Sequence, residues 1–295
     1  MGPEKNDPGY LTSNWCQLNW GEWFTLSKNA ASKAPREAGL YRVKRADSNQ
    51  LDYIGETGRP IKSRLMELAR GIEASEMPFR DPHTAAPCLW AINQEYGDIE
   101  VSCAVSNLNS PDRKALERYL IWEYRLETGS SPTANFGRVI KGWRMSSYRK
   151  DGMRGKRLLI GENEAHSDLG LPPTTPNNIE DVLGQNWVGQ NWTDSIHLQK
   201  LPIIDNAPSS AGLYRIWKQN ADILWYIGES KNLKTRLLNH AQNHRNLGLL
   251  CSYTPRPELD SLHKRQEAES DLIGAHFKVC GCAPEAQYGR QTIQR

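Results

Sequence analysis

The chain carries one sequence pattern twice, and this repetition limits the possible fold more than any other feature. GLYRVKRADSNQLDYIG at 39–55 is matched by GLYRIWKQNADILWYIG at 212–228, which begins 173 residues later. Farther along, ERYLI beginning at Glu117 is matched by ESDLI beginning at Glu269, 152 residues later. Since order and spacing survive over most of both halves, the 295 residues predict a duplicated chain with two domains, each burying its own core.

The difference between the two offsets places about twenty extra residues in the first copy. They fall near 71–93, where the sequence predicts a loop that includes His83. His83 either contacts the substrate or contributes to a site, or it is an ordinary exposed loop histidine. The expected division of the chain is an N-terminal domain at 1–138, a linker at 139–183 and a C-terminal domain at 184–295.

Short polar turns between apolar, β-branched segments predict a hairpin in each copy, and amphipathic helices follow. If each hairpin is centred on its turn, its two tyrosines lie opposite each other on one face of the sheet. These pairs are Tyr41 with Tyr53 and Tyr214 with Tyr226. The predicted strands cover 40–44, 51–54, 212–218 and 223–227, and the predicted helices cover 60–69, 113–126, 232–241 and 265–277.

These pieces stand in a recognisable order. GLY is followed by YIG, then by a helix with arginine, a helix with Glu-x-x-Leu-Ile and, in the first copy, Pro-x-x-Asn. Residues 39–138 and 212–290 therefore resemble the GIY-YIG nuclease family. The resemblance implies an α/β fold of the α+β kind, with two GIY-YIG domains that are each a small, mostly antiparallel sheet flanked by helices. It also implies cleavage of phosphodiester bonds with one divalent metal in each site, Mg²⁺ or alternatively Mn²⁺.

The family's roles carry over position by position to both copies. The first tyrosine helps to deprotonate the attacking water, the second positions water or phosphate, and the arginine binds phosphate. A glutamate binds the metal, and a histidine one turn after the arginine is present in the second copy alone. The catalytic residues so implied are Tyr41, Tyr53, Arg64, Glu117, Tyr214, Tyr226, Arg236, His240 and Glu269, with Glu117 and Glu269 as the metal ligands.

The two copies depart from the family pattern in different places. Arg59 is an alternative phosphate-binding arginine in the first copy. The first copy has Leu68 in the place of His240, and the second has Gln287 in the place of the late Asn135. Both copies also carry a glutamate directly after YIG, Glu56 in the first and Glu229 in the second. We expect the negative charge of this residue to weaken the positive field around the tyrosines.

The chemistry of the reaction explains these residue types. Hydrolysis of a phosphodiester gathers negative charge on the phosphate, which a cation and a guanidinium stabilise. One carboxylate is enough to hold Mg²⁺ when phosphate oxygens and waters complete its octahedron. A tyrosine, whose unperturbed pKa is about 10, acts as a base where a nearby positive charge lowers that pKa.

A basic segment, residues 138–157, separates the two copies. It is interleaved with Trp143 and Tyr148, as in segments that contact bases or sugars, and an acidic, proline-rich stretch follows at 161–181. The segment either tracks the DNA backbone or is a solvated linker. The net charge of +3 does not by itself indicate a nucleic-acid partner. The residues predicted to bind DNA are Asn135, Arg138, Lys141, Arg144, Arg149, Lys150, Arg154, Lys156 and Arg157.

Other features exclude several classes of protein. No apolar run reaches the ~18–20 residues of a membrane-spanning helix. The start, MGPEKNDPGY, lacks a secretion signal, so we expect a cytoplasmic protein without a membrane partner. The six cysteines show neither a disulfide framework nor zinc spacing and are expected to be reduced thiols. The repeated tryptophans are expected to anchor the core or the domain interface; they are Trp15, Trp20, Trp187 and Trp192.

The leading hypothesis is a metal-dependent endonuclease that cuts double-stranded DNA in restriction or a similar defence. Each copy would cut one strand, so that a monomer acts as a pseudo-dimer; every core position is present twice, which favours two active sites. In one alternative a single copy cuts while the other grips DNA. In another the chain is a repair or structure-selective nuclease, because YIGESKNLKTRLL at 226–238 resembles the excision-repair branch of the family. A third alternative is a DNA-binding protein without catalysis.

Overall fold

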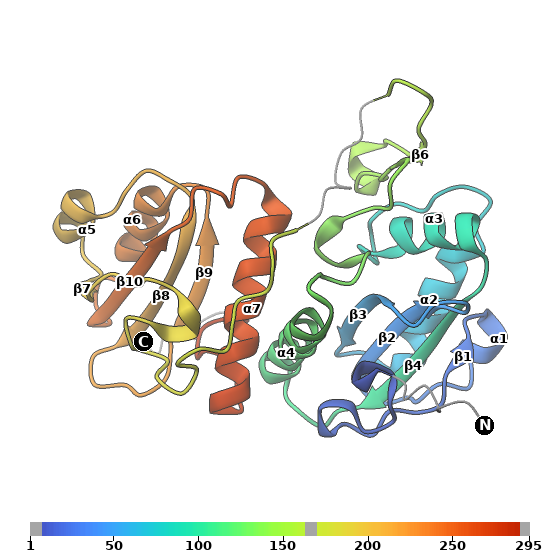
Figure 1. Ribbon diagram of the computed structural model, residues 1–295, viewed down its shortest axis with the longest axis horizontal. Coiled ribbons are helices and arrows are strands. Elements are labelled where there is room, and N and C mark those ends of the chain that lie inside the picture. Colours follow the sequence, from blue (N-terminus) through green and yellow to red (C-terminus); the bar gives the residue numbers. More distant parts are fainter. Residues whose placement is uncertain (1–7, 163–169, 290–295) are drawn as a thin grey trace, which may run out of the picture. The chain divides into compact units, whose positions relative to one another are not determined.

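The computed structural model describes residues 8–162 and 170–289, and residues 1–7, part of the stretch searched for a secretion signal, lie outside this description. The chain divides into two compact units (Figure 1). Unit 1 comprises Met1–Leu108 and Ser131–Leu169, and unit 2 comprises Asn109–Ser130 and Gly170–Arg295. This division differs from the expected one, because residues 109–130 group with unit 2 and the segment expected to begin a linker groups with unit 1.

Unit 1 is built on a four-stranded antiparallel sheet with strand order β1-β4-β2-β3. Helices α2 and α3 cover one of its faces, and a small hairpin of β5 and β6 follows the sheet in sequence. The strands are β1 (Phe24–Thr25), β2 (Gly39–Arg45), β3 (Leu51–Thr57), β4 (Ile99–Val105), β5 (Trp143–Arg144) and β6 (Lys156–Arg157), and the helices are α1 (Lys28–Ala31), α2 (Ile61–Ile72) and α3 (Ala86–Tyr96).

Unit 2 contains a second antiparallel sheet of the same design, with strand order β7-β10-β8-β9. One face of this sheet packs on α6, and the opposite face packs on α7, which lies beside α4 (Figure 1). Both units are therefore of the α+β class, as predicted. The strands are β7 (Ile196–His197), β8 (Gly212–Lys218), β9 (Tyr226–Ser230) and β10 (Leu249–Pro255), and the helices are α4 (Ser110–Thr128), α5 (Lys200–Asn206), α6 (Leu233–Asn243) and α7 (Leu262–Cys280).

The helices begin and end where local chemistry dictates. The side chain of Asn109 accepts a hydrogen bond from the backbone N–H of Asp112 and so caps α4, and Asn232 caps α6 in the same way. Gly129 ends α4 in a left-handed conformation, as glycine does at many helix ends. Each predicted helix is present and extends by one to three residues beyond one or both predicted ends. The insertion is not all loop as predicted, because its second half forms α3.

The register of the hairpins differs from the predicted one. Tyr41 pairs with Gly55 rather than with Tyr53, and Tyr214 pairs with Gly228 rather than with Tyr226. The two tyrosines of each hairpin are therefore diagonal neighbours on one face, with ring centroids 5.8 Å apart in unit 1 and 6.0 Å apart in unit 2. The shared face was predicted correctly; the direct opposition was wrong, because the tyrosine takes the open space over a residue without a side chain.

The repeated tryptophans lie inside each unit and anchor its core around a buried arginine. The Arg42 guanidinium lies 4.4 Å from the ring of Trp20, and that of Arg215 lies 4.5 Å from the ring of Trp192. Burial lowers the pKa of each arginine to about 9, and the charge is compensated by backbone carbonyls and by the ring faces. The carbonyl acceptors are those of Tyr10, Leu11 and Thr12 for Arg42, and those of Val182, Leu183 and Gly184 for Arg215.

Helices α4 and α7 pack antiparallel about a local twofold axis. Gly274 faces Trp122, the residue to which it corresponds in the repeat. On one side of this contact, the rings of Tyr119 and Phe277 lie 6.0 Å apart. On the other side, the equivalent positions of the repeat are Asp271 and Arg125, which form a 2.8 Å ion pair. Residues from equivalent helices thus meet as in the isologous interface of a homodimer.

All six cysteines are free thiols in the structure. Within 8–162 and 170–289, no helix combines the length and the apolar character that crossing a membrane requires.

We predict that Gly274→Ala lowers the stability of unit 2. The new Cβ would lie 2.8 Å from the carbonyl oxygen of Arg118 and 3.0 Å from the Cβ of Trp122. Alanine favours a helix over glycine by about 1 kcal/mol, but overpacking costs about 1–3 kcal/mol, so α4 must move away. Thermal unfolding followed by circular dichroism should show a melting temperature lower by several degrees.

Gly289→Ala is the matched control, because a Cβ at Gly289 meets no atom of the described residues within 4 Å. A Gly274→Ala variant that melts at or above the wild-type temperature would show that the close approach of α4 and α7 is not required.

Candidate active sites

In unit 1, four of the polar and aromatic side chains converge on one face of the sheet. Tyr41 lies on β2 and Tyr53 on β3, while Arg64 comes from α2 and His83 from the insertion. The hydroxyl of Tyr41 makes a 2.8 Å hydrogen bond with Nε2 of His83 and accepts one from Nε of Arg64 at 3.3 Å. The ring of Tyr53 completes the group, 5.5 Å from the ring of His83.

Unit 2 contains the same arrangement. Tyr214 lies on β8 and Tyr226 on β9, and α6 supplies both Arg236 and His240. The hydroxyl of Tyr214 makes a 2.9 Å hydrogen bond with Nε2 of His240 and accepts one from Nε of Arg236, also at 2.9 Å. The ring of Tyr226 lies 5.2 Å from that of His240. The structure thus brings together these predicted residues of the second copy, as it does Tyr41, Tyr53 and Arg64 in the first.

His83 is the residue that sequence reasoning left undecided. Its side chain is buried and takes the position at the tyrosine hydroxyl that His240 takes in unit 2. Leu68, which corresponds to His240 in sequence, is buried in the hydrophobic core instead. The two histidines arrive from different elements, an insertion and a helix, so alignment of the repeats does not pair them. The signal available in the sequence was the coincidence of a missing histidine and an added one within the same copy.

Glycine at the third position of YIG makes the arrangement possible. A Cβ at Gly55 would lie 2.8 Å from the hydroxyl oxygen of Tyr41, and a Cβ at Gly228 would overlap the ring and hydroxyl of Tyr214. The tyrosine ring therefore crosses the neighbouring strand directly above the glycine backbone. Any side chain there would displace the hydroxyl from its histidine and arginine partners.

The electrostatics of the unit 2 site keep the tyrosine and the histidine neutral at rest. Burial, and then the neighbouring Tyr226, raise the pKa of Tyr214 above its ordinary value, although Arg236 opposes this. Burial, Arg236 and His244 together lower the pKa of His240 to about 3. In unit 1, burial followed by Arg64 likewise lowers the pKa of His83 well below its usual range. Each histidine is therefore a neutral imidazole beside a tyrosine hydroxyl.

Asn135 and Gln287 do the same work in the two units. The Asn135 amide accepts from the backbone N–H of Ile54 at 3.1 Å and donates to its carbonyl at 2.9 Å. Gln287 makes the same two contacts with Ile227, both at 2.9 Å. Ile54 and Ile227 are the central residues of YIG on the edge strands β3 and β9. Asn135 is buried, and its amide is bound to the backbone of Ile54. Its amide therefore holds β3 in place and does not face the solvent, from which the predicted contact with DNA would be made.

The alternative arginine of the first copy is bound elsewhere. Arg59 forms a two-pronged ion pair with Glu67, at 2.9 and 2.7 Å. Arg64 lies against the tyrosine hydroxyl and donates to the carbonyl of Pro82 at 3.1 Å. Of the two candidates, Arg64 is therefore the one in the position of Arg236.

Glu269 of α7 is the acidic member of the unit 2 site. Burial, and then the neighbouring Glu229, raise the pKa of its carboxyl to about 7, while Arg118 and Arg236 partly oppose this. Glu229, the acid that follows YIG, forms a 2.7 Å ion pair with Arg265. This pair compensates part of the charge of Glu229, and the expected weakening of the positive field around the tyrosines stays a prediction.

Glu117 lies on α4, which groups with unit 2, whereas Tyr41, Tyr53 and Arg64 belong to unit 1. The carboxylate of Glu117 lies 3.9 Å from the guanidinium of the next residue, Arg118. Its predicted role as the metal ligand of the first copy stays a prediction.

The basic segment is part of unit 1, and several of its charges are paired with acids of that unit. Arg157 binds Glu95, Arg154 lies 3.6 Å from Glu76, and Arg149 lies 3.8 Å from Asp81. Lys156 and Arg144 both pair with Glu162, Arg138 is buried, and Lys141 and Lys150 are exposed. Side chains such as Arg149, about 72% exposed, remain accessible, and the predicted contact of this segment with DNA stays a prediction.

Comparison with known proteins gives a distant match. No protein-family model matches the chain. The chain is 30% identical over 112 residues to UvrABC system protein C of Rhodospirillum rubrum, a match that covers 36% of this chain and 15% of that protein. This similarity supports the resemblance to nucleases of the GIY-YIG kind at that coarse level and does not bear on the presence of two copies.

We predict that the imidazole of His240 stays neutral between pH 5 and 8, because its pKa is lowered to about 3. Below the ordinary histidine pKa of about 6.5 the unfolded chain binds a proton that the folded chain does not, so this residue makes stability fall as the pH falls from about 6.5 toward 3. NMR titration of the histidine side chains measures the pKa directly. Arg236→Gln removes a neighbouring cation and should raise the pKa of His240; a wild-type midpoint near 6.5 would contradict the prediction.

Proposed function

We propose that the protein is a metal-dependent endonuclease with two active sites, each of which cuts one strand of double-stranded DNA. The observation that carries the proposal is the tyrosine hydroxyl held between a neutral histidine and an arginine, which occurs once in each unit. Two independent elements, the insertion and α6, supply the histidine for the same contact. A packing role for either histidine would not require this repeated geometry.

The tyrosine relays a proton from the attacking water. In unit 2, Arg236 donates to the hydroxyl oxygen of Tyr214, so the hydroxyl proton of Tyr214 is free to point toward Nε2 of His240. As water attacks the phosphorus, its proton passes to the Tyr214 oxygen while the Tyr214 proton passes to His240. The raised pKa of Tyr214 makes this partner necessary, because the phenol does not ionise alone near neutral pH. Tyr41 and His83 act in the same way in unit 1.

The arginine has a second task in this scheme. Arg236 makes one bond to Tyr214 through Nε, and its remaining N–H groups also reach Tyr226. A guanidinium presents five donors in a planar fork, so it can hold a phosphate oxygen while it keeps the Tyr214 oxygen in position for the proton relay. Tyr226 orients the phosphate or the water from the neighbouring strand.

The residues around Glu269 fit a divalent cation. Partial burial, and then the neighbouring carboxylate of Glu229, raise the pKa of the Glu269 carboxyl to about 7, and a cation would relieve both the desolvation and the repulsion. Among the described residues no group of three or more His, Cys, Asp and Glu could hold an ion, which suits a site completed by phosphate oxygens and waters. Glu269 would hold the metal in unit 2, and Glu117 would do so for the first copy. A bound Mg²⁺ or Mn²⁺ supplies Lewis acidity at the phosphate and its leaving oxygen.

A second candidate function is structure-selective cleavage, as in repair. The similarity to UvrABC system protein C favours it, although the match covers 15% of that protein. Comparison of cleavage rates on intact plasmid and on flap or bubble oligonucleotides separates this function from restriction-like cutting of intact duplex.

We predict that Glu117→Gln and Glu269→Gln each nick supercoiled plasmid but no longer linearise it. Loss of the metal ligand removes several kcal/mol of charge stabilisation, so cutting of one strand should slow by at least about a hundredfold. The double variant should cut neither strand, and chelation with EDTA should stop the wild type. Agarose gels of a time course in Mg²⁺ measure the three plasmid forms.

Glu22→Gln, at an exposed glutamate, is the control and should linearise plasmid at the wild-type rate. If one single variant abolishes all cutting, that site holds the chemistry and the other copy grips DNA. If the wild type cuts no substrate in Mg²⁺ or Mn²⁺, the nuclease function is wrong and a DNA-binding protein is left.

A further inference from the structure

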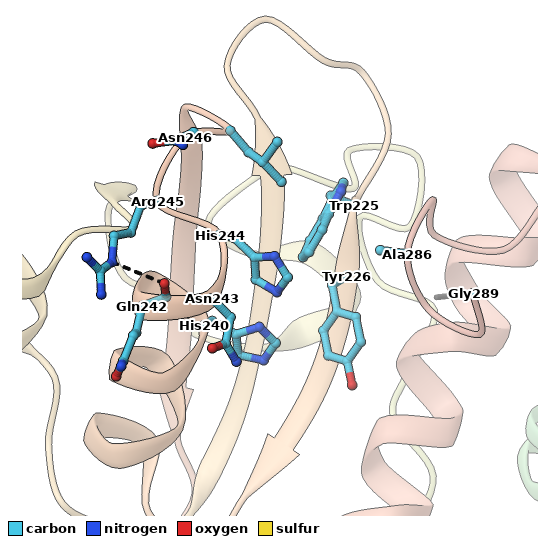
Figure 2. A pocket seen from close by; sticks show the side chains of 11 residues that line it. Trp225, Tyr226, His240, Gln242, Asn243, His244, Arg245, Asn246, Ala286 and Gly289 are labelled. Carbon is cyan, nitrogen blue, oxygen red and sulfur yellow. Dashed lines mark hydrogen bonds between the residues drawn. The ribbon is translucent and has the colours of Figure 1, made fainter. Parts of the chain in front are cut away.

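A pocket of about 780 Å³ opens directly beside the unit 2 site. Tyr226 and His240 belong to both the site and the pocket wall, so the pocket directly adjoins the residues proposed to act on the phosphate (Figure 2). The wall continues through Trp225 and His244, whose rings meet edge to face with centroids 4.9 Å apart. Its rim includes Gln242, Asn243 and Asn246, of which Asn243 lies beside His240 in Figure 2.

The corresponding space in unit 1 is filled by the insertion. Ala74 lies just after α2, as Asn246 lies just after α6, and the indole N–H of Trp90 on α3 donates to the carbonyl of Ala74 at 2.8 Å. Gly137 corresponds to Gly289, and the guanidinium of Arg80 lies 2.8 Å from where a Cβ would stand on it. At Gly289 such a Cβ would meet none of the described atoms within 4 Å. The same position is thus occupied by the insertion in unit 1, whereas in unit 2 none of the described residues fills it.

The lining specifies a flat ligand with hydrogen-bonding edges. Aromatic side chains stack on nucleobases regardless of sequence, and amides pair with the donors and acceptors of base edges. Burial lowers the pKa of His244, so its ring is a neutral stacking surface near pH 7. The pocket's arginine, Arg245, donates to the carbonyl of Gln242 at 3.2 Å, and Figure 2 shows its guanidinium turned away from the aromatic rings. These features suit a base better than a second phosphate.

We propose that this pocket binds an unstacked nucleobase of the strand that unit 2 cuts, immediately next to the scissile phosphate. The inference rests on the proposed function for the identity of the substrate. The base stacks on the rings of Tyr226 and His244, and the amide of Asn243 contacts its edge. Unit 1, where the insertion fills this position, cuts its strand without such a contact, so the two sites of one chain differ in what they read.

The first test uses deoxynucleoside 5′-monophosphates as probes, with deoxyribose 5-phosphate as the probe that lacks a base. NMR of the tryptophan indole N–H groups, with the Trp225 signal assigned through Trp225→Phe, reports binding to the full-length chain. We expect at least one monophosphate to shift the Trp225 signal saturably and the baseless sugar phosphate to leave it unchanged. His244→Ala and Asn243→Ala should each weaken binding about five- to tenfold, in proportion to one lost stacking or edge contact.

Asn239→Ala is the matched control, because Asn239 is an exposed asparagine one turn earlier on α6 and does not line the pocket. It should bind like the wild type, and thermal unfolding of all three variants identifies any loss of folding. Equal binding of deoxyribose 5-phosphate and the monophosphates would overturn the proposal, since phosphate alone would explain it. Unchanged binding by both His244→Ala and Asn243→Ala would also overturn it.

A second arm separates this proposal from the nuclease function. In the Glu117→Gln background, where unit 2 alone is proposed to cut, sequencing of the cut ends should show a base preference beside the break that Asn243→Ala removes. A faster cut when that base is unpaired identifies an already single strand as the source, and an equal rate identifies a base flipped from duplex. Cutting without any base preference overturns the pocket and leaves the nuclease intact. Absence of cutting in this background assigns the chemistry to the copy that contains Glu117 and overturns the placement of the pocket beside a cutting site, while binding of the monophosphates is measured independently.

Discussion

The site in each unit depends on one constraint, which is a tyrosine ring that lies across the bare backbone of a glycine on the neighbouring strand. Tyr41 pairs with Gly55 and Tyr214 with Gly228, and in both pairs a Cβ on the glycine would strike the tyrosine side chain. This crossing places the hydroxyl over the edge strand, within hydrogen-bonding distance of the helix that supplies arginine. A histidine and an arginine then bind the hydroxyl, and the amide of Asn135 or Gln287 holds the edge strand in place.

The two units reach the same contact by different routes, and this difference has consequences beyond the contact itself. In unit 2 the histidine is one turn from Arg236 on α6, so no further segment is needed and the pocket beside Trp225 stays open. In unit 1 the histidine comes on an insertion whose Arg80 and Trp90 fill the corresponding space. Because the histidine comes from different elements in the two units, both sites can perform the same chemistry while, in the described part of the chain, only the unit 2 site has a pocket for a neighbouring base.

Much of the fold followed from the sequence, and the errors have physical reasons. Alternation, turn residues and helical spacing predicted the hairpins and helices, because these signals are local. The register was wrong because alternation fixes which face a tyrosine takes but not which cross-strand neighbour it meets. His83 was left undecided because a single histidine in a loop carries no periodicity. Asn135 and Gln287 looked like a difference between the copies, yet the longer amide reaches the same backbone. The grouping of α4 with unit 2 depends on Gly274 and on Arg125, whose partner Asp271 is 146 residues away, a distance that local patterns do not register.

The central claim is that His83 and His240 do equal work at two sites that each cut one strand. It is tested most directly by the rates at which His83→Ala, His240→Ala and the double variant nick and linearise supercoiled plasmid in Mg²⁺, with the exposed His197→Ala as control. The account predicts that each single variant nicks plasmid but linearises it about a hundredfold more slowly, as expected for loss of a general base, and that the double variant does neither. Linearisation by His83→Ala at the wild-type rate, while His240→Ala stops it, would contradict the account.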